Sequence, residues 1–250
     1  MNNPFAKYNI THLSPSSCNL FIGSPAMYIM ERLMGVRNQV GAAAHRGSAV
    51  EAGIAHGLVN GAPLAECQSV AKKEFDKLSA LSGDPRREKE AGSLADMVEQ
   101  GLNELRPYGK PSSTQGRIEY HVEGLAVPLI GYYDFEWEQH GVLVDLKTTH
   151  ALPSKISTNH ARQVALYVAA RGDNLSARVT YTTTKKVATY ALEDKREHVR
   201  SLERVALTIQ RFLSQSDDPK ELASFVVPDV DSFYFNDPAV RQAAFEIWGL

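Results

Sequence analysis

Residues 131–149, GYYDFEWEQHGVLVDLKTT, place two aspartates and a lysine in one short segment. Its two halves are rich in aliphatic and aromatic residues and flank a polar EQHG that ends in glycine, which is typical of a β-hairpin. A turn centred on the Gln-His dipeptide would place Asp134 directly opposite Asp145, with Cβ atoms about 4.5 to 5.5 Å apart. Alternation along the second strand turns Lys147 to the same face as Asp145. Three charged groups are therefore expected to converge.

Two facing carboxylates repel each other unless a positive charge lies between them or one of them holds a proton. A divalent metal ion would supply that charge, and Lys147 would add a fixed cation beside it. One or two such ions make water nucleophilic near neutral pH and stabilise charged oxygens, which is what phosphodiester hydrolysis requires. The segment therefore predicts a hydrolytic metal site; the alternative is a solvent-exposed hairpin with scattered charges.

Composition limits the classes of protein to which the chain can belong. With 250 residues, 22% charged and 43% hydrophobic, it is long enough for one well-buried domain with some decoration, or at most two small ones. The net charge is −2, so phosphate binding must come from a local patch or from metal ions. Two distant cysteines, Cys18 and Cys67, exclude a zinc ribbon or a four-cysteine cluster made by this chain alone. Without a signal-peptide pattern or a long apolar run, we expect a cytoplasmic protein that does not enter a membrane.

The order of elements read from the sequence is helices, three strands, a helix, two strands and a long helix. This order indicates an α/β fold with a central mixed sheet flanked by helices. We expect one domain, with a helical part over about residues 1–112, a sheet core over about 113–192, and a C-terminal helix and tail over about 193–250. Before the sheet, AAAHRGSAVEAGIAHGLVNG has the spacing of an amphipathic helix, with Glu51 at the edge of its apolar face.

The order of four short motifs resembles the PD-(D/E)xK nuclease superfamily. These are an acid after RG on a helix, then GYYDF, then VDLKTT, then RQVALY on a following helix. Among its members, RecB-type and lambda-exonuclease-like nucleases are most similar, because their last motif is a glutamine and a tyrosine four residues apart, here Gln163 and Tyr167. The resemblance implies a restriction-endonuclease-like core with helical additions at both ends.

The resemblance also implies roles for individual residues. Asp134, Asp145 and Glu51 would be metal ligands, together with the Leu146 carbonyl, and oxygen ligands suit one or two Mg²⁺ or Mn²⁺ ions. Lys147 would position or help to deprotonate the attacking water and balance charge in the transition state. Gln163 would hold the lysine or water, and Tyr167 would pack or contact the substrate backbone. Arg46 and Arg162 would contact phosphates. Glu119, on the preceding strand, would match an acidic position seen in some relatives.

One departure from the family pattern concerns iron–sulfur clusters. Cluster-bearing relatives have a cysteine before the proline of the first helix, where this chain has Ser24 before Pro25. We therefore expect no iron–sulfur cluster. The sequence has no phosphate-binding G-x-x-x-x-G-K-[ST] motif either, so a helicase partner would be another chain.

The function predicted from these residues is a metal-dependent DNA exonuclease acting in phage or bacterial recombination, repair or DNA degradation. Its partner would be linear DNA. The sequence leaves open whether it also acts with a single-strand annealing or helicase protein and whether it forms a homo-oligomer. Two alternatives remain: an endonuclease of the same fold, and a non-catalytic protein that binds DNA ends.

Overall fold

The structure is a computed structural model that describes residues 3–250 and divides the chain into two compact units. Unit 1 comprises Met1–Gln39, Ile118–Gly131 and Arg196–Leu250, and unit 2 comprises Val40–Arg117 and Tyr132–Lys195. The units alternate along the chain and so cut across the three consecutive parts expected from the sequence. The single nuclease domain stays a prediction.

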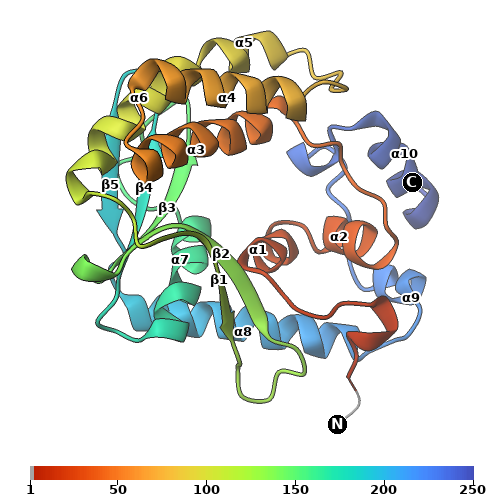
Figure 1. The fold of residues 1–250 in the computed structure, drawn as a ribbon. Coiled ribbons are helices and arrows are strands. Elements are labelled where there is room, and N and C mark those ends of the chain that lie inside the picture. Colours follow the sequence, from red (N-terminus) through yellow and green to blue (C-terminus); the bar gives the residue numbers. More distant parts are fainter. Residues whose placement is uncertain (1–2) are drawn as a thin grey trace. The chain divides into compact units, whose positions relative to one another are not determined.

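A five-stranded sheet in the order β1-β2-β3-β4-β5 provides the framework (Figure 1). The strands are β1 (Ser113–Tyr120), β2 (Leu129–Trp137), β3 (Val142–Thr148), β4 (Ser176–Thr182) and β5 (Val187–Ala191), and β1 and β2 carry residues of both units. β2 pairs with β3 and β4 with β5 in antiparallel fashion, whereas β3 and β4 are parallel. The predicted α/β fold with a mixed sheet is confirmed.

The hairpin of β2 and β3 has the register expected from the sequence. Phe135 pairs with Val144, and Trp137 pairs with Val142. Between the strands, the 3-10 helix η4 (Glu138–His140) ends at Gly141, whose φ of 59° lies in the left-handed region that glycine adopts most readily. Continued by one pair, this register brings Asp134 to Asp145.

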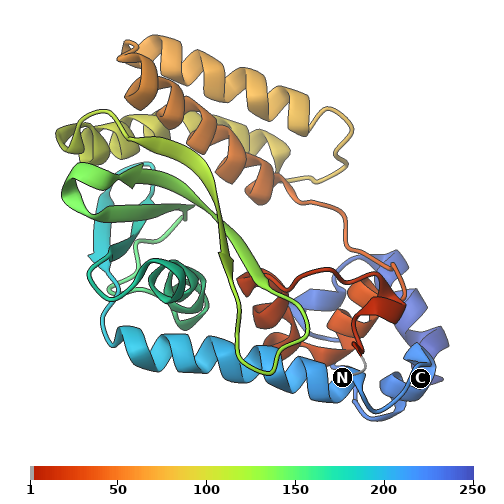
Figure 2. The same ribbon diagram turned by 60° about the horizontal axis from the view of Figure 1, so that its bottom comes forward.

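Helices cover both faces of the sheet in unit 2 (Figure 2). They are α3 (Ala42–Asn60), α4 (Leu64–Leu78), α5 (Arg87–Gly92), α6 (Leu94–Leu105) and α7 (Thr158–Arg171). One hydrophobic core unites α3, α4 and α6 with Phe135, Val144 and Leu146 of the hairpin. Strand residues one position away therefore face the opposite side, where α7 connects β3 to β4.

α3 and α4 pack closely because α3 has glycine at the contact. A Cβ atom on Gly53 would lie 2.7 Å from the Cys67 carbonyl oxygen and 3.0 Å from the Ala71 Cβ. The two helices pack in the core that also includes Phe135, Val144 and Leu146 of the hairpin, and α3 carries Glu51.

Unit 1 is mainly helical. Its elements are η1 (Ala6–Tyr8), α1 (Pro15–Gly23), α2 (Pro25–Tyr28), the π-helical η2 (Ile29–Leu33), α8 (Lys195–Leu213, from its second residue), α9 (Pro219–Ser224), η5 (Phe233–Phe235) and α10 (Pro238–Trp248). The Ser24 side chain caps α2 by accepting from the Met27 N–H at 3.1 Å, and Pro25 starts that helix. The cap and the proline separate α2 from α1, which ends at Gly23.

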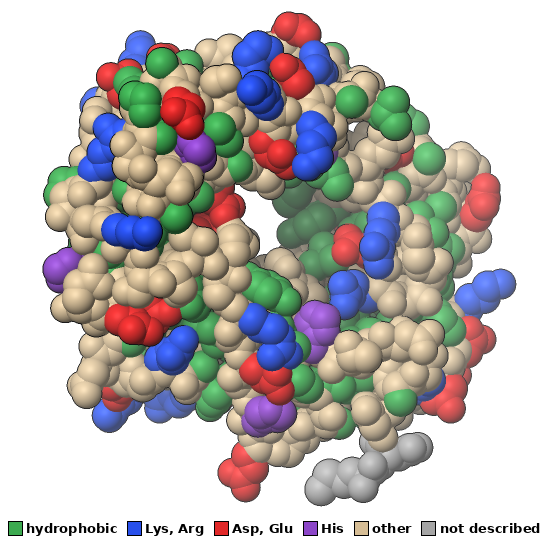
Figure 3. Space-filling view, viewed as in Figure 1, with side chains coloured by type: hydrophobic (Ala, Val, Ile, Leu, Met, Phe, Trp, Pro, Cys, Tyr) green, Lys and Arg blue, Asp and Glu red, His purple; other side chains and the backbone are tan. Residues whose placement is uncertain are grey.

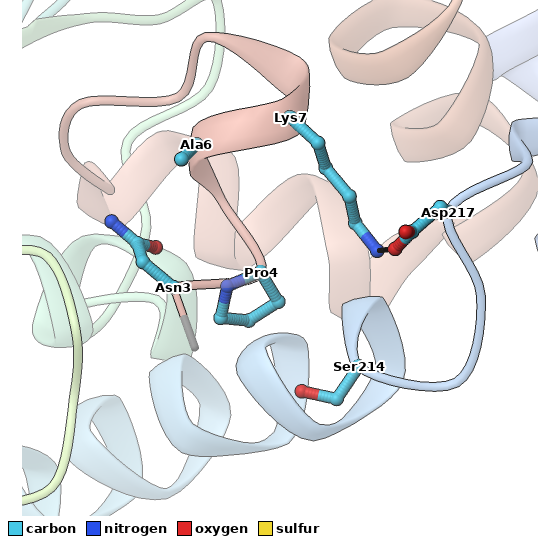
Figure 4. A pocket seen from close by; sticks show the side chains of 6 residues that line it. All are labelled: Asn3, Pro4, Ala6, Lys7, Ser214 and Asp217. Atoms are coloured by element: carbon cyan, nitrogen blue, oxygen red, sulfur yellow. Dashed lines mark hydrogen bonds and ion pairs between the residues drawn. The ribbon is translucent and has the colours of Figure 1, made fainter. Parts of the chain in front are cut away.

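A small cavity of about 320 Å³ lies in unit 1 beside η1 (Figure 4). It is lined by Asn3, Pro4, Ala6, Lys7, Ser214 and Asp217. The Lys7 ammonium forms an ion pair with Asp217 and donates to the Ser216 carbonyl at 2.6 Å. Its charge is thus largely offset within the protein.

Charged side chains of both signs are mixed on the face shown in Figure 3, where Lys and Arg lie among Asp and Glu over α4 and α5. This mixture agrees with the small net charge of −2. In the part of the chain that the structure describes, no helix is long and apolar enough to cross a membrane.

Gly53→Ala should lower the free energy of unfolding by about 1–3 kcal/mol, because the added methyl overlaps backbone of α4 and an overpacked core must shift. Gly92→Ala is the matched control, since a Cβ there meets no atom within 4 Å. Urea unfolding measures both. Equal stability of the two variants would show that α3 and α4 can separate without loss.

Candidate active site

The hairpin presents Asp134 and Asp145 away from the core that α3, α4 and α6 form. Asp134 is 9% exposed and Asp145 is 1% exposed. The Asp134 Oδ2 accepts a hydrogen bond from the Leu146 N–H at 2.6 Å, so a side chain of β2 bonds directly to the backbone of β3. This bond fixes the Asp134 carboxylate beside the β3 segment that carries Asp145.

Asp145 is held by donors from α7 and from its own strand. Its Oδ1 accepts from the Gln163 Nε2 at 2.7 Å and from the Tyr167 hydroxyl at 3.1 Å. Gln163 and Tyr167 are four residues apart and therefore share one face of α7. The Lys147 Nζ lies 2.6 Å from Oδ2 as an ion pair. Asp145, Lys147, Gln163 and Tyr167 thus form one contact network.

Glu51 approaches the same site from α3. Its Oε1 accepts from the Gln115 side-chain amide, which also donates to the Asp134 Oδ1 at 3.3 Å. Burial raises the pKa of Glu51 to about 7, with the negative charge of Asp145 adding to the rise and Lys147 opposing it. The mutual influence of Glu51 and Asp145 shows that the helix and the hairpin share one electrostatic site.

The other charged groups respond in the same way. Burial, followed by the charges of Asp145 and Glu51, raises the pKa of Asp134 well above its ordinary value. Burial by itself lowers the pKa of Lys147, but the neighbouring carboxylates, Asp145 first, outweigh it and raise the pKa. Lys147 therefore keeps its proton at neutral pH. Its single positive charge does not balance the three nearby acids, Glu51, Asp134 and Asp145.

The residues present fit a divalent cation. Within residues 3–250, no three His, Cys, Asp or Glu side chains converge tightly enough to hold a metal ion as they stand, since the carboxylates are turned to neighbouring donors. The buried Asp145 Oδ2, however, receives no well-aligned hydrogen bond from a described residue, although Lys147 is close. An oxygen in this state, beside Asp134 and Glu51, is suited to a hard cation.

The contacts of Gln163 and Tyr167 can be compared with the roles predicted for them. Gln163 donates to Asp145 rather than to Lys147. Tyr167 is buried and donates to Asp145 and to the Tyr132 carbonyl, the latter at 2.8 Å. Both residues therefore contact Asp145, and their roles toward substrate or water stay predictions. The Leu146 N–H bonds Asp134, and the role of its carbonyl as a ligand stays a prediction.

Arg46 is buried at the end of β3 in a polar cluster of unit 2. It forms an ion pair with Glu90 and donates from Nε to the Thr148 Oγ1 at 3.2 Å, while His150 lies 3.0 Å from its Nη1. Burial raises the pKa of Glu90, but His150 and Arg46 outweigh it and hold the pKa below its ordinary value. These contacts tie α3 to α5 and β3, and contact between Arg46 and phosphate stays a prediction.

The remaining predicted residues lie in less direct positions. Arg162 is 8% exposed on α7, where it donates to the Asn159 Oδ1 at 2.9 Å. Glu119 belongs to unit 1 and pairs with His121. The substrate-binding role of Arg162 and the acidic role of Glu119 stay predictions.

Sequence reasoning missed Gln115. His160 of α7 also lies near the charged groups of the site. The His160 ring is 2.6 Å from the Tyr181 hydroxyl, and burial together with the positive charge of Lys147 lowers the pKa of His160. Tyr181 pairs with Lys147 across the parallel strands. Tyr181 follows Lys147 by 34 positions in the sequence, so only the pairing of β3 with β4 shows that the two residues are neighbours.

Comparison with known proteins gives one substantial match. The family model described as the PD-(D/E)XK nuclease superfamily matches residues 12–239. No protein of curated function matches significantly. Among solved structures, the protein named in "Crystal structure of SSO0001" is similar at 18% identity, covering 59% of this chain and 70% of that one, with a TM-score of 0.33. That likeness is too weak to carry an argument.

Glu51→Gln should stabilise the metal-free protein by roughly 1–2 kcal/mol at pH 8 and by much less at pH 5. A carboxyl whose pKa is raised on folding binds its proton more tightly in the folded state. Its ionisation therefore lowers stability as pH rises from 4.5, the ordinary value, to about 7. Urea unfolding in EDTA measures the difference, with the exposed Glu88→Gln as the control.

A loss of stability for Glu51→Gln that is equal at both pH values would contradict this expectation. It would mean that ionised Glu51 stabilises the fold.

Proposed function

Because this chain belongs to the PD-(D/E)XK nuclease superfamily, we propose that it is a metal-dependent exonuclease that hydrolyses DNA from its ends. The superfamily membership makes it a nuclease of a class that uses divalent metal ions, generally Mg²⁺ or Mn²⁺. Its five-stranded mixed sheet with flanking helices agrees with a restriction-endonuclease-like core.

The observation that carries the proposal is the ion pair of Asp145 and Lys147 beside Asp134. Asp145 is almost fully buried, and the Lys147 Nζ is 2.6 Å from its Oδ2. A structural ion pair needs only two opposite charges, whereas this one adjoins Asp134 and Glu51, whose pKa values both rise. Such an excess of carboxylates destabilises the protein alone and is characteristic of a site that receives a cation.

In this proposal, Glu51, Asp134 and Asp145 would hold one or two ions. When bound, the ions would make a water molecule nucleophilic and stabilise charge on the phosphodiester. All three residues offer oxygen, which favours Mg²⁺ or Mn²⁺ over softer metals. Asp134 and Asp145 lie on paired strands, so their positions are set by backbone hydrogen bonds rather than by a loop.

Lys147 provides the remaining charge. Because its pKa is raised, it is an ammonium at neutral pH and cannot accept a proton from water. It is suited to orienting the water by donating a hydrogen bond and to offsetting negative charge that builds up on the phosphate oxygens. Of the two roles expected from the sequence, we therefore favour positioning and charge balance over deprotonation.

Action on DNA ends rests on the motif of α7. Gln163 and Tyr167 match the last motif of RecB-type and lambda-exonuclease-like nucleases, and both support Asp145. A role in phage or bacterial recombination, repair or DNA degradation follows from the same resemblance. An endonuclease of the same fold is the second candidate, because the site chemistry is common to both.

The proposal is tested by digesting end-labelled linear duplex DNA and covalently closed circular DNA with Mg²⁺, with Mn²⁺ or with EDTA. Loss of linear DNA alone is expected, only with metal. Lys147→Ala should reduce the rate by about 10²–10³-fold, the usual effect of removing one group that stabilises transition-state charge. Lys72→Ala, which removes an exposed lysine of α4, should keep the full rate.

Three outcomes distinguish the candidates. Nicking of closed circles would favour the endonuclease. Metal-independent cleavage, or full activity of Lys147→Ala, would remove the site from the reaction. Binding of DNA ends without cleavage under any metal would support the non-catalytic alternative.

A further inference from the structure

Gln115 has an unusual backbone conformation for a residue within a strand. Its φ is +53°, in the left-handed region that residues other than glycine rarely adopt. A conformation of this kind costs on the order of 1–3 kcal/mol and persists only where surrounding contacts enforce it. Gln115 belongs to the part of β1 that lies in unit 2, which also holds Glu51 and Asp134.

The backbone of β1 is closely packed at the next residue, Gly116. A Cβ atom on Gly116 would lie 2.1 Å from the ring of Tyr133, so the backbone of β1 passes directly against that ring. The Tyr133 hydroxyl is itself fixed, because it bonds to the Ser113 Oγ at 2.8 Å and donates to Glu136. β1 is thereby held against β2 one residue before Asp134, with Gln115 at the bend.

The Gln115 side chain joins two acids that come from different elements. Its amide nitrogen donates to the Glu51 Oε1 on α3 and, at 3.3 Å, to the Asp134 Oδ1 on β2. Gln115 itself is exposed, so water could satisfy its amide equally well. The need to satisfy a buried polar group therefore does not explain these bonds.

We infer that Gln115 is a positioning residue that holds the Glu51 carboxylate toward Asp134 and so preorganises the metal site. The inference rests on the proposed function, since it assumes that Glu51 and Asp134 bind the metal. A neutral amide offsets little of the repulsion between the two acids, but its two N–H groups can fix their directions. The strained backbone is the means by which the amide reaches both.

The test measures binding of Mn²⁺ to the whole protein without DNA, by the loss of the free-ion EPR signal, beside urea unfolding in EDTA. Gln115→Ala should weaken Mn²⁺ binding by about 10-fold or more, as is typical for residues that orient metal ligands. Gln68→Ala, which removes an amide of α4, should bind Mn²⁺ like the wild type.

Two further variants separate positioning from a purely structural role. Gln115→Gly relieves the strain, and Gln115→Asn keeps an amide and tolerates positive φ but is one methylene shorter. Both should unfold at urea concentrations equal to or above that of Gln115→Ala, yet bind Mn²⁺ as weakly as it does. If Gln115 served only the fold, both would bind Mn²⁺ with wild-type affinity.

Failure of this inference can be distinguished from failure of the proposed function. Wild-type Mn²⁺ binding that Asp134→Asn abolishes but that no Gln115 variant changes would overturn the positioning role alone. A wild-type protein that binds no Mn²⁺ would overturn the metal site, and the role of Gln115 with it.

Discussion

Repulsion among three carboxylates, countered by one ammonium, is the constraint on which the site depends. Two like charges 4 Å apart near a protein surface repel each other by about 4 kcal/mol. Asp134, Asp145 and Glu51 share one partly dry site, where burial first and the negative charge of Asp145 second raise the pKa values of Asp134 and Glu51. Lys147 offsets one charge of the three, so the folded protein tolerates the site at the expense of stability.

Hydrogen-bond donors make that arrangement possible. The Leu146 N–H, the Gln163 amide, the Tyr167 hydroxyl and the Gln115 amide each donate to a carboxylate oxygen. They come from β3, α7 and β1, and α7 contributes two of the four donors. Because charge-assisted hydrogen bonds are stronger than neutral ones, these contacts fix the direction of acids that would otherwise turn away from each other.

Much of this site could be predicted because its geometry is local. The alternation of apolar and charged residues places Phe135 and Val144 in the core, and one position away it places Asp134 and Asp145 on the other face. Spacing of four on a helix likewise puts Gln163 and Tyr167 side by side. A hairpin register and a helical period are both set by nearby residues, so the sequence contains them.

Contacts between distant segments could not be predicted in this way. The buried state of Arg46 depends on Glu90, which lies on another helix, so an arginine beside a motif acid gave no sign that its charge was already paired. The positive φ of Gln115 lies next to the close approach of Gly116 to Tyr133, and no propensity of glutamine predicts it. Gln163 was expected to hold the lysine or water, and its bond to Asp145 depends on how α7 packs against β3.

Contacts set by nearby residues and contacts between distant segments meet at the site. Together they give the acids a defined geometry and lower the stability of the folded protein. The register of the hairpin and the alternation along its strands bring Asp134, Asp145 and Lys147 together. The two carboxylates of this group repel each other. Tertiary contacts then add Glu51, a further negative charge, held by a residue whose own backbone is strained. A ligand that binds only the folded state stabilises it by mass action, so a cation at these acids would return the stability lost in assembling them. Binding of a cation would therefore be coupled to the folding of unit 2 through Glu51, Asp134 and Asp145.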